Sequence, residues 1–382
     1  MRRFLTIALL LSVVTTAPAG TPLGDGAVVS LLTCGEGGEV ETFFGHSAIR
    51  VRDTANGIDY VYNYGTYDFN QPHFYWSFAR GNLNYCLSRD SYRHFMQCYR
   101  AERRAVYEQR LMLDGREREN LFILLETNYE PEYRYYRYDF FRDNCATRPR
   151  DVIDAALGRR SIRYNEPVQR ITYRDVVYGA TAGHLWWRFA LDLVLGMPTD
   201  HVCNARELMF APFHLMQLAG SATLDDGQPL SSPATELLPG EQTATSCPVS
   251  PLAAGWGLFV VIVVLSMTGS RRGWSLRWID CILYGTGFLV SLLLIFLWFG
   301  TSHHYTNWNL NLLWASPLWL YFLIRGRQSA RWMTVVQMTM LAAAMVLTLI
   351  GVPQQINSAV VPLSLTLFVR LTASLHENHK QQ

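Results

Sequence analysis

Two short segments carry residue types that could act together as a nucleophile and a base. Cys145 lies in the stretch DNCATRPRD, where a helix is predicted to begin, and His46 follows a glycine where a strand is predicted to begin. Unpaired amides and the dipole at a helix start favour an anion, which lowers the pKa of a thiol there. A nearby imidazole could take the proton of the thiol, and the backbone amide of Cys145 could contribute to an oxyanion hole.

Both residues also have a structural interpretation. A cysteine in a mixed α/β domain is commonly a small buried residue or half of a disulfide, and a histidine at a strand start is commonly structural. Cys34, followed by glycine-rich sequence, is a rival nucleophile, but no helix is predicted to begin there. Cys86–Cys98 and Cys203–Cys247 are candidate bridges. Spacing alone therefore leaves the role of the cysteine–histidine pair open.

Periodicity predicts the elements that position the pair. Residues that alternate or run apolar predict strands over 27–33, 47–52, 58–64, 105–113 and 133–141. Capping and apolar patterns predict helices over 91–103, 114–125 and 146–157. The second and third strands form a hairpin around the turn signal Asn56-Gly57. The sequence therefore predicts an α+β domain over 21–218, followed by a linker over 219–251 that is rich in Ser, Thr, Pro and Gly.

The start of the chain has the pattern of an export signal. Residues 1–20 place Arg2 and Arg3 before an apolar run, and Ala17 and Ala19 fit a small-x-small cleavage site. The apolar run is too short to span a bilayer. We therefore expect a cleaved signal peptide over 1–20 and an exported N-terminal domain.

Apolar segments after the linker predict a membrane domain over 252–371 and a cytoplasmic tail over 372–382. The predicted spans are 252–267, 279–299, 310–324, 333–352 and 358–371. Arginines occupy the connections 270–278 and 325–332, whereas 300–311 and 353–357 contain neither Arg nor Lys. The positive-inside rule places the arginine-bearing connections in the cytoplasm and the N-terminal domain outside. The signal peptide predicts the same topology.

The composition excludes two classes of protein and offers no metal site. Only 17% of the residues are charged and the net charge is +2, which argues against a nucleic-acid-binding protein with a clustered basic face. The apolar share of 49% excludes disorder. The adjacent His303 and His304 do not by themselves give the geometry of metal ligands. We therefore expect no metal, no cofactor and no nucleic-acid partner.

Five stretches occur in a specific order along the chain. They are LLTC at 31–34, FGHSAIRV at 44–51, YNYG at 62–65, FYWSFARG at 74–81 and YYRYDFFRDNCATRPRD at 135–151. In this order they resemble the Lnb family, which pairs a periplasmic domain with a C-terminal transmembrane domain. The family is best known as the lipoprotein N-acyltransferase of Bacteroides-type bacteria. The histidine-then-cysteine order also resembles the permuted papain-like thiol enzymes of the lecithin:retinol acyltransferase group.

The resemblance implies a fold, a location and two catalytic roles. The fold is an α+β permuted papain-like periplasmic domain followed by an all-α multi-span membrane domain in the bacterial inner (cytoplasmic) membrane. By position, Cys145 is the nucleophile that carries the acyl group as a thioester, and His46 is the general base. Asn63, on the strand after the histidine, is the candidate for a third residue that orients the imidazole. A two-residue turn would place Asn63 opposite Arg50, with Tyr67 nearer to His46.

The resemblance also implies the substrates. The acyl donor is a phospholipid, the acceptor is the N-terminal amine of a diacylglyceryl lipoprotein, and membrane lipids surround both. Arg148 or Arg80 could bind the donor phosphate, and the polar loop 301–309, with His304, could line the entrance. Trp186-Trp187 could dock at the membrane interface, where tryptophan is favoured, or pack in the domain core.

Two other functions stay open at this point. The first keeps the thiol chemistry and changes the substrate, giving a papain-like cell-wall peptidase or amidase with an open polar groove. The second is a non-catalytic envelope protein, which would follow if Cys145 were part of a disulfide. The predicted multi-span half favours acyl transfer, because both of its substrates lie in the bilayer.

Overall fold

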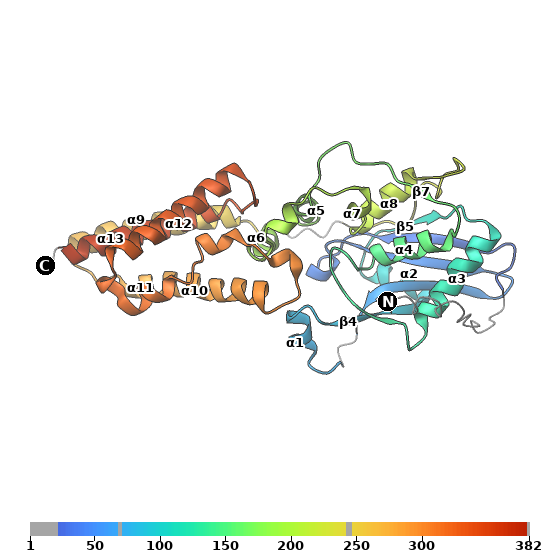
Figure 1. The fold of residues 1–382 in the computed structure, drawn as a ribbon, viewed down its shortest axis with the longest axis horizontal. Helices are drawn as coiled ribbons and strands as arrows, with labels where there is room; N and C mark the ends of the chain where they lie inside the picture. The colour runs from blue at the N-terminus through green and yellow to red at the C-terminus, as the bar shows by residue number, and fades with distance from the viewer. Residues whose placement is uncertain (1–21, 68–70, 242–246, 380–382) are drawn as a thin grey trace, which may run out of the picture.

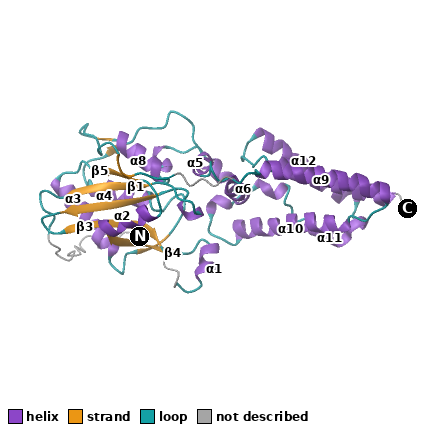
Figure 2. Ribbon diagram, turned by 180° about the vertical axis from the view of Figure 1, so that it is seen from behind, coloured by secondary structure: helices purple, strands orange, loops and turns teal. Residues whose placement is uncertain are grey.

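The computed structural model describes residues 22–67, 71–241 and 247–379, and these form two domains placed end to end (Figure 1). The signal peptide expected over 1–20 lies outside the described residues. Strands occur in the first domain and the second is helical, as the view from behind shows (Figure 2). The predicted order, an α+β domain followed by an all-α domain, is confirmed.

An antiparallel sheet forms the centre of the first domain. Seven strands of the described residues pair in the order β6-β4-β3-β2-β1-β5-β9. Their bounds are β1 Val28–Cys34, β2 His46–Asp53, β3 Ile58–Thr66, β4 Asn84–Ser91, β5 Val106–Arg110, β6 Tyr135–Arg137 and β9 Thr235–Leu238. A separate two-stranded ribbon joins β7 Ile162–Arg163 to β8 Thr223–Leu224. The strand predicted over 133–141 is therefore shortened to the three residues of β6.

Both faces of the sheet are buried under helices. The helices of this domain are α1 Phe74–Ala79, α2 Tyr92–Ala101, α3 Gly115–Tyr129, α4 Thr147–Ala156, α5 Tyr173–Ala180, α6 Leu185–Val194, α7 Ala205–Leu208 and α8 Pro212–Ser221. Because side chains alternate along a strand, the fully buried Leu31 and Leu32 enter different cores. Leu31 packs in the core that includes Leu121 of α3 and Ile153 of α4, and Leu32 packs in the one that includes Phe95 of α2.

The segment predicted as a linker contains part of the sheet. Within 219–251, β9 pairs with the edge strand β5, and β8 pairs with β7. An open edge strand exposes unpaired amides and carbonyls, and β9 satisfies those of β5. Short strands inside Ser-, Thr- and Pro-rich sequence carry little periodicity, so composition alone suggested a linker. The sheet therefore extends to Leu238, closer to the membrane domain than expected.

The second domain is built from long apolar helices. The five helices after residue 250 are α9 Pro251–Arg272, α10 Arg277–Phe299, α11 Trp319–Arg325, α12 Arg331–Ile350 and α13 Val360–His379. Among the described residues, α9, α10 and α12 are long and apolar enough to cross a membrane. At 1.5 Å per residue they reach about 30 to 35 Å, which matches the hydrocarbon core of a bilayer.

The other two predicted spans are shorter than a membrane crossing. Residues 310–324 form a 3-10 turn over Leu310–Leu313 and the short helix α11, separated near Pro317. Proline has no amide proton to continue a helix. The apolar part of α13 is Val360–Ala373, and the helix continues to His379, within the segment predicted as a tail. The count of five spans stays a prediction.

The arginine-bearing connections lie at the end of the domain that is farthest from the sheet (Figure 1). Arg271, Arg272 and Arg277 flank the turn between α9 and α10, and Arg325 and Arg331 flank the turn between α11 and α12. The two turns are also close together, since a Cβ on the glycine after α11 would lie 3.8 Å from the Arg277 guanidinium. This arrangement agrees with the predicted topology.

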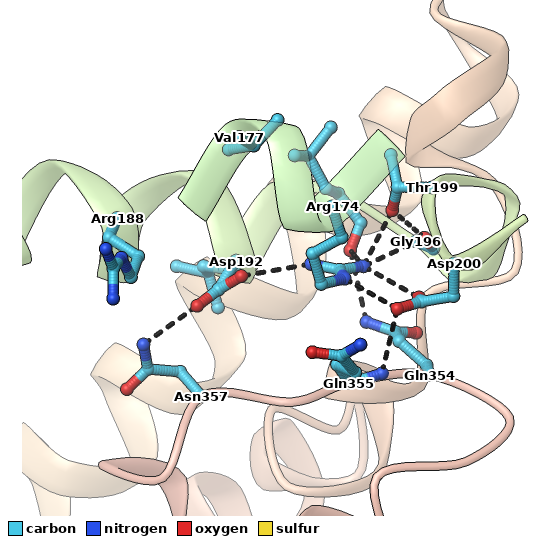
Figure 3. Close-up of polar contacts among 12 residues, drawn as sticks. Arg174, Val177, Arg188, Asp192, Gly196, Thr199, Asp200, Gln354, Gln355 and Asn357 are labelled. Atoms are coloured by element: carbon cyan, nitrogen blue, oxygen red, sulfur yellow. Dashed lines mark hydrogen bonds and ion pairs between the residues drawn. The ribbon is translucent and has the colours of Figure 1, made fainter. Parts of the chain in front are cut away.

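A fully buried arginine organises the end of the first domain that meets the second. The Arg174 side chain on α5 has no exposed surface and pairs with two aspartates (Figure 3). Its guanidinium lies 3.0 Å from the carboxylate of Asp192 on α6 and 2.9 Å from that of Asp200. It also donates to the hydroxyl of Thr199 at 2.7 Å. Burial of these charges is tolerated because every one of them is paired.

The same aspartates hold the loop between α12 and α13. Asn357 donates to the second carboxylate oxygen of Asp192 at 2.8 Å, and the backbone amide of Gln355 donates to Asp200 at 3.2 Å. Gln354, also fully buried, donates to the carbonyl of Leu195 at 3.1 Å. Figure 3 shows the loop lying beneath the Arg174 cluster. These contacts fix the sheet domain on the end of the helical domain that carries no arginine.

Candidate active site

Cys145 is held at the start of α4 by the residue before it. The buried Asn144 side chain accepts hydrogen bonds from the amides of Ala146 and Thr147 at 2.8 and 2.9 Å. Its amide group donates to the carbonyls of Phe140 and Phe210 at 2.6 and 2.8 Å. The Asn144 side chain therefore satisfies two amides at the start of α4 and also ties this segment to the surrounding loops.

The thiol of Cys145 lies against the two strands that carry the other candidate residues. The backbone amide of Ser47, the residue after His46, hydrogen-bonds to its sulfur. A Cβ on Gly65 of β3 would lie 3.2 Å from the Cβ of Cys145, and Gly65 has a φ of 89° that favours glycine. Gly65 therefore lets α4 approach the sheet closely enough to place the sulfur beside the start of β2.

His46 and Asn63 contact each other directly. Nε2 of His46 lies 3.2 Å from Oδ1 of Asn63. A carbonyl oxygen only accepts, so this contact is a hydrogen bond in the tautomer that carries the proton on Nε2, and in that neutral tautomer Nδ1 is the basic nitrogen. The structure thus brings the three residues expected to be catalytic close together. The sulfur of Cys145 accepts a hydrogen bond from the amide of Ser47, next to His46, and Cys145 packs against Gly65, two residues after Asn63.

The hairpin that carries this pair has a different register from the one expected. Arg50 lies opposite Val61, two residues before Asn63. The connecting turn is longer than Asn56-Gly57, because the carboxylate of Asp53 accepts from the side-chain amide of Asn56 at 2.7 Å and closes a four-residue turn. The shift moves Asn63 closer to His46 than a two-residue turn would.

Burial keeps both catalytic candidates uncharged. Burial raises the pKa of the Cys145 thiol to about 11, although the amide of Ser47 acts in the opposite direction. Burial also lowers the pKa of His46 to about 4, against a smaller upward effect of Asn63. The helix start was expected to lower the pKa of the thiol, but loss of water around the sulfur outweighs it. At neutral pH the pair is a thiol and a neutral imidazole.

This protonation state predicts how Cys145 reacts with an alkylating agent. The rate with iodoacetamide should rise by about tenfold per pH unit from pH 6 to 9.5, because the thiolate fraction grows without saturating below a pKa near 11. Peptide mass spectrometry of the Cys145 peptide measures the rate, and free cysteine, with a pKa of about 8.5, is the reference that levels off. A plateau for Cys145 below pH 8 would show a stabilised thiolate instead.

The residues expected to bind the donor lie in two places. Arg148, near Cys145 on α4, donates to both carboxylate oxygens of Asp143 at 2.6 and 2.8 Å and lies over the ring of Tyr136. Arg80 lies at the end of α1, where its Nε donates to the carbonyl of Gly300 at 3.3 Å. The exposed His304 belongs to the loop after α10, close to Arg80. The structure therefore groups Arg80 with this loop and leaves Arg148 with the thiol.

The other cysteines differ from Cys145 in burial and in position. Cys34 lies opposite His46 in the β1–β2 ladder, but it is fully buried and burial raises its pKa to about 12. Cys145 is a free thiol and is partly exposed. Cys98 and Cys203 are also free thiols, so neither candidate bridge is formed.

A cavity of about 900 Å³ opens next to the start of β2. Phe43 and Phe44, which precede His46, line it together with Ile171, Val176 and Phe213. Apolar side chains and glycines make up most of the wall. This wall differs from the open polar groove expected of a peptidase.

Sequence reasoning missed two groups at the thiol. The amide of Ser47 and the backbone of Gly65 both lie against Cys145, and contacts made by the backbone are not signalled by residue type. Both lie inside the stretches FGHSAIRV and YNYG, so the motifs contained the signal. Tyr67, which was expected nearer to His46, instead packs against Phe74 and Tyr85.

Two family models match the chain. The Lnb N-terminal periplasmic domain matches residues 24–178, and the Lnb transmembrane domain matches residues 242–382. The protein belongs to the Lnb family. The periplasmic match contains the three candidate catalytic residues, and the transmembrane match contains all three helices that are long enough to span. Its members carry a periplasmic domain on a membrane domain, so the sheet domain of this Lnb protein is periplasmic.

No curated protein and no solved structure matches this Lnb chain. Within residues 22–67, 71–241 and 247–379, no three His, Cys, Asp or Glu side chains gather as metal ligands would. The function is therefore inferred from the family match and from the geometry around Cys145.

Proposed function

We propose that this protein moves a fatty acyl chain from a membrane phospholipid, through a thioester on Cys145, to the N-terminal amine of a diacylglyceryl lipoprotein. The observation that carries the proposal is the placement of the Cys145 sulfur on the amide of Ser47, beside the His46–Asn63 pair. Membership of the Lnb family suggests lipoprotein N-acylation. The periplasmic end of the membrane helices is where both lipid substrates are available.

The first half of the reaction forms the acyl-enzyme. Nδ1 of His46 accepts the thiol proton as the sulfur of Cys145 attacks the ester carbonyl. The amides of Ser47 and Cys145, both at the sulfur, are the nearest donors for the negative oxygen that develops. Collapse of the intermediate breaks the ester bond, and the imidazolium returns its proton to the leaving lysophospholipid oxygen. Asn63 holds the ring in one tautomer throughout.

The second half transfers the chain to nitrogen. The acceptor amine attacks the thioester carbonyl, and His46 takes the proton that the amine loses. The C–S bond breaks as the amide forms, and the proton returns to the sulfur of Cys145. The neutral resting state of the pair suits both halves, since each begins with an imidazole that must accept a proton.

The cavity lined by Phe43 and Phe44, which come shortly before His46 in the chain, supports an acyl substrate over a cell-wall peptide, although His46 and Cys145 do not themselves line it. Its aromatic and aliphatic wall suits a hydrocarbon chain, whereas a peptidase subsite needs polar groups that pair with a peptide backbone. The same thiol would serve either reaction. The substrate is therefore identified by testing which compound acylates Cys145.

Mass spectrometry of the purified protein after incubation with phospholipid vesicles tests the proposal. The wild type should gain the mass of one acyl chain, labile to neutral hydroxylamine and mapped to Cys145. Cys145→Ala should gain none, while Cys98→Ala, which removes another free thiol of the same domain, should be acylated like the wild type. An unmodified wild type, or an adduct that persists in Cys145→Ala, would refute the thioester.

A further inference from the structure

The short helix α1 presents large aromatic side chains to its surroundings. Tyr75, Trp76 and Phe78 are 81%, 56% and 56% exposed. Such a cluster on one six-residue helix is the kind of surface that an apolar partner covers. Its position in the molecule indicates which partner this is.

α1 contacts the periplasmic end of α10. The ring of Trp76 lies 6.0 Å from that of Phe296, about one turn before the helix ends at Phe299. Arg80, just after α1, donates to the carbonyl of Gly300 at the end of α10. Both views show α1 beside this end of α10 (Figures 1 and 2). α10 is long and apolar enough to span a bilayer. In a spanning helix of this length the last turn would lie near the bilayer boundary, and α1 contacts that turn.

A second helix with exposed aromatic side chains, α6, contacts the chain just before α9 begins. Trp186 and Trp187 of α6 are 44% and 48% exposed. The indole of Trp186 donates to the carbonyl of Val249 at 2.8 Å, two residues before α9 begins at Pro251. Aromatic residues therefore surround the periplasmic ends of two apolar helices, as they do at the interface of membrane proteins.

A row of aromatic rings leads from α1 into the sheet domain. Phe74 of α1 lies 6.0 Å from Tyr67, Tyr67 lies 5.4 Å from Tyr85, and Tyr85 stacks on Tyr138 at 4.1 Å, all measured between ring centroids. Each of the four residues is partly exposed. The row is thus a run of partly exposed rings that extends from α1 to the edge of the core.

The row ends at the thiol. A Cβ on Gly65 would lie 3.6 Å from a ring carbon of Tyr138 and 3.2 Å from the Cβ of Cys145. Tyr138 and Cys145 therefore flank the same glycine. The aromatic row therefore connects α1 to the residue that lies next to the thiol.

We propose that α1 lies in the periplasmic interface of the bilayer and that the aromatic row guides the ester of a membrane phospholipid from there to Cys145. This inference rests on the proposed acyl transfer and adds the surface that meets the lipid and the route that the lipid takes. Aromatic faces suit the acyl chain, and the tyrosine hydroxyls suit the ester and glycerol oxygens. In this proposal the ester moves out of the bilayer along the aromatic row until it reaches the sulfur of Cys145.

Photo-crosslinking tests the position of α1. The full-length protein carries p-benzoylphenylalanine at Tyr75, or at Thr54 as the control, in nanodiscs of phosphatidylethanolamine and phosphatidylglycerol. Thr54 is exposed in the β2–β3 turn, at the opposite end of β2 from His46. Irradiation should give a phospholipid adduct at position 75 and none at position 54. Equal labelling of the two positions, or no adduct at position 75, would overturn the membrane position.

Acylation rates test whether the route begins at the exposed aromatic side chains of α1. The variant Tyr75→Ser/Trp76→Ser/Phe78→Ser is compared with the wild type on vesicle phospholipid and on a short-chain phosphatidylcholine below its micelle concentration. The ratio of the vesicle rate to the monomer rate should fall by about tenfold, because only the vesicle substrate needs the interfacial contact. An unchanged ratio would overturn the route, whether or not both rates fall together.

The two proposals fail in different ways. If the wild type forms no acyl-enzyme with either phospholipid, the acyl transfer is refuted, and crosslinking at position 75 still decides where α1 lies. If the wild type is acylated and the ratio is unchanged, acyl transfer stands and the route is refuted.

Discussion

Replacing His46 with alanine is expected to slow the acylation of Cys145 by about 10²- to 10⁴-fold, the usual contribution of a positioned general base. The thiol has a pKa near 11, so almost none of it is ionised at neutral pH. Attack on an ester therefore depends on a group that removes the proton during the reaction. Single-turnover acylation from vesicle phospholipid, followed by mass spectrometry, measures the loss.

The pH dependence identifies the base. The pKa of His46 is about 4, because burial disfavours the imidazolium form, so the imidazole can accept a proton at every pH above that value. Acylation by the wild type should be nearly constant from pH 5 to 7 and fall below about pH 4. The hydrogen bond of Asn63 raises the pKa of His46. Asn63→Ala should therefore shift this acidic limb to lower pH as well as slow the reaction.

His94→Ala is the matched control for His46→Ala. His94 is an exposed histidine of the same domain, on α2, where its ring lies 3.7 Å from the sulfur of Cys98. Its removal should leave acylation unchanged. If His46→Ala were acylated as fast as His94→Ala, another group would be the base.

Replacing Arg174 with methionine is expected to reduce the free energy of unfolding by about 3 to 5 kcal/mol, the cost of leaving a buried charge without its partner. Asp192 and Asp200 lie within 3.0 Å of the guanidinium and would lose it together. Burial already raises the pKa of both carboxyl groups, against the effect of Arg174. Pulse proteolysis of the detergent-solubilised protein across a urea series measures the change.

Arg206→Met is the matched control for Arg174→Met. Arg206 also pairs with two aspartates, Asp151 and Asp154, but its side chain is 50% exposed. Exposed pairs contribute about 0 to 1 kcal/mol, so this variant should be close to the wild type. Equal effects of the two substitutions would contradict a special role for the buried cluster. Arg174→Met/Asp192→Asn should recover part of the loss, because it removes one of the unpaired charges.

Local signals predicted the start of α4 well. The Asn144 side chain satisfies two amides at the start of the helix, so a few consecutive residues specify where Cys145 lies. The capping box of Asp114 and Glu117 at the start of α3 is predictable for the same reason. The order of the motifs suggested which histidine belongs with the cysteine. The resemblance to permuted papain-like enzymes suggested Asn63, with Tyr67 as the alternative, and Asn63 contacts His46.

Features that depend on distant parts of the chain were not predictable. The register of the β2–β3 hairpin is set by the side chain of Asp53 as well as by the turn residues. The pKa of Cys145 depends on how much protein surrounds the sulfur, which no local pattern reports. Arg174 is one arginine among many in the sequence, and nothing local indicates that it pairs with Asp192. Asp192 in turn accepts a hydrogen bond from Asn357, which lies 165 residues further along the chain. Long-range burial, rather than local propensity, accounts for these differences.

The pairing of β9 with β5 determines how much of the chain must be present before the sheet of this domain is complete. β5 stays an open edge until Thr235–Leu238 has been synthesised and translocated, and the first apolar helix begins soon afterwards at Pro251. The sheet that positions His46 and Cys145 can therefore close only when export of the domain is nearly finished. A chain halted before residue 235 would expose an unpaired strand next to the core, where it is prone to join another chain. The last strand of the sheet and the first apolar helix are therefore close neighbours in the chain, so the sheet becomes complete only shortly before the membrane domain begins.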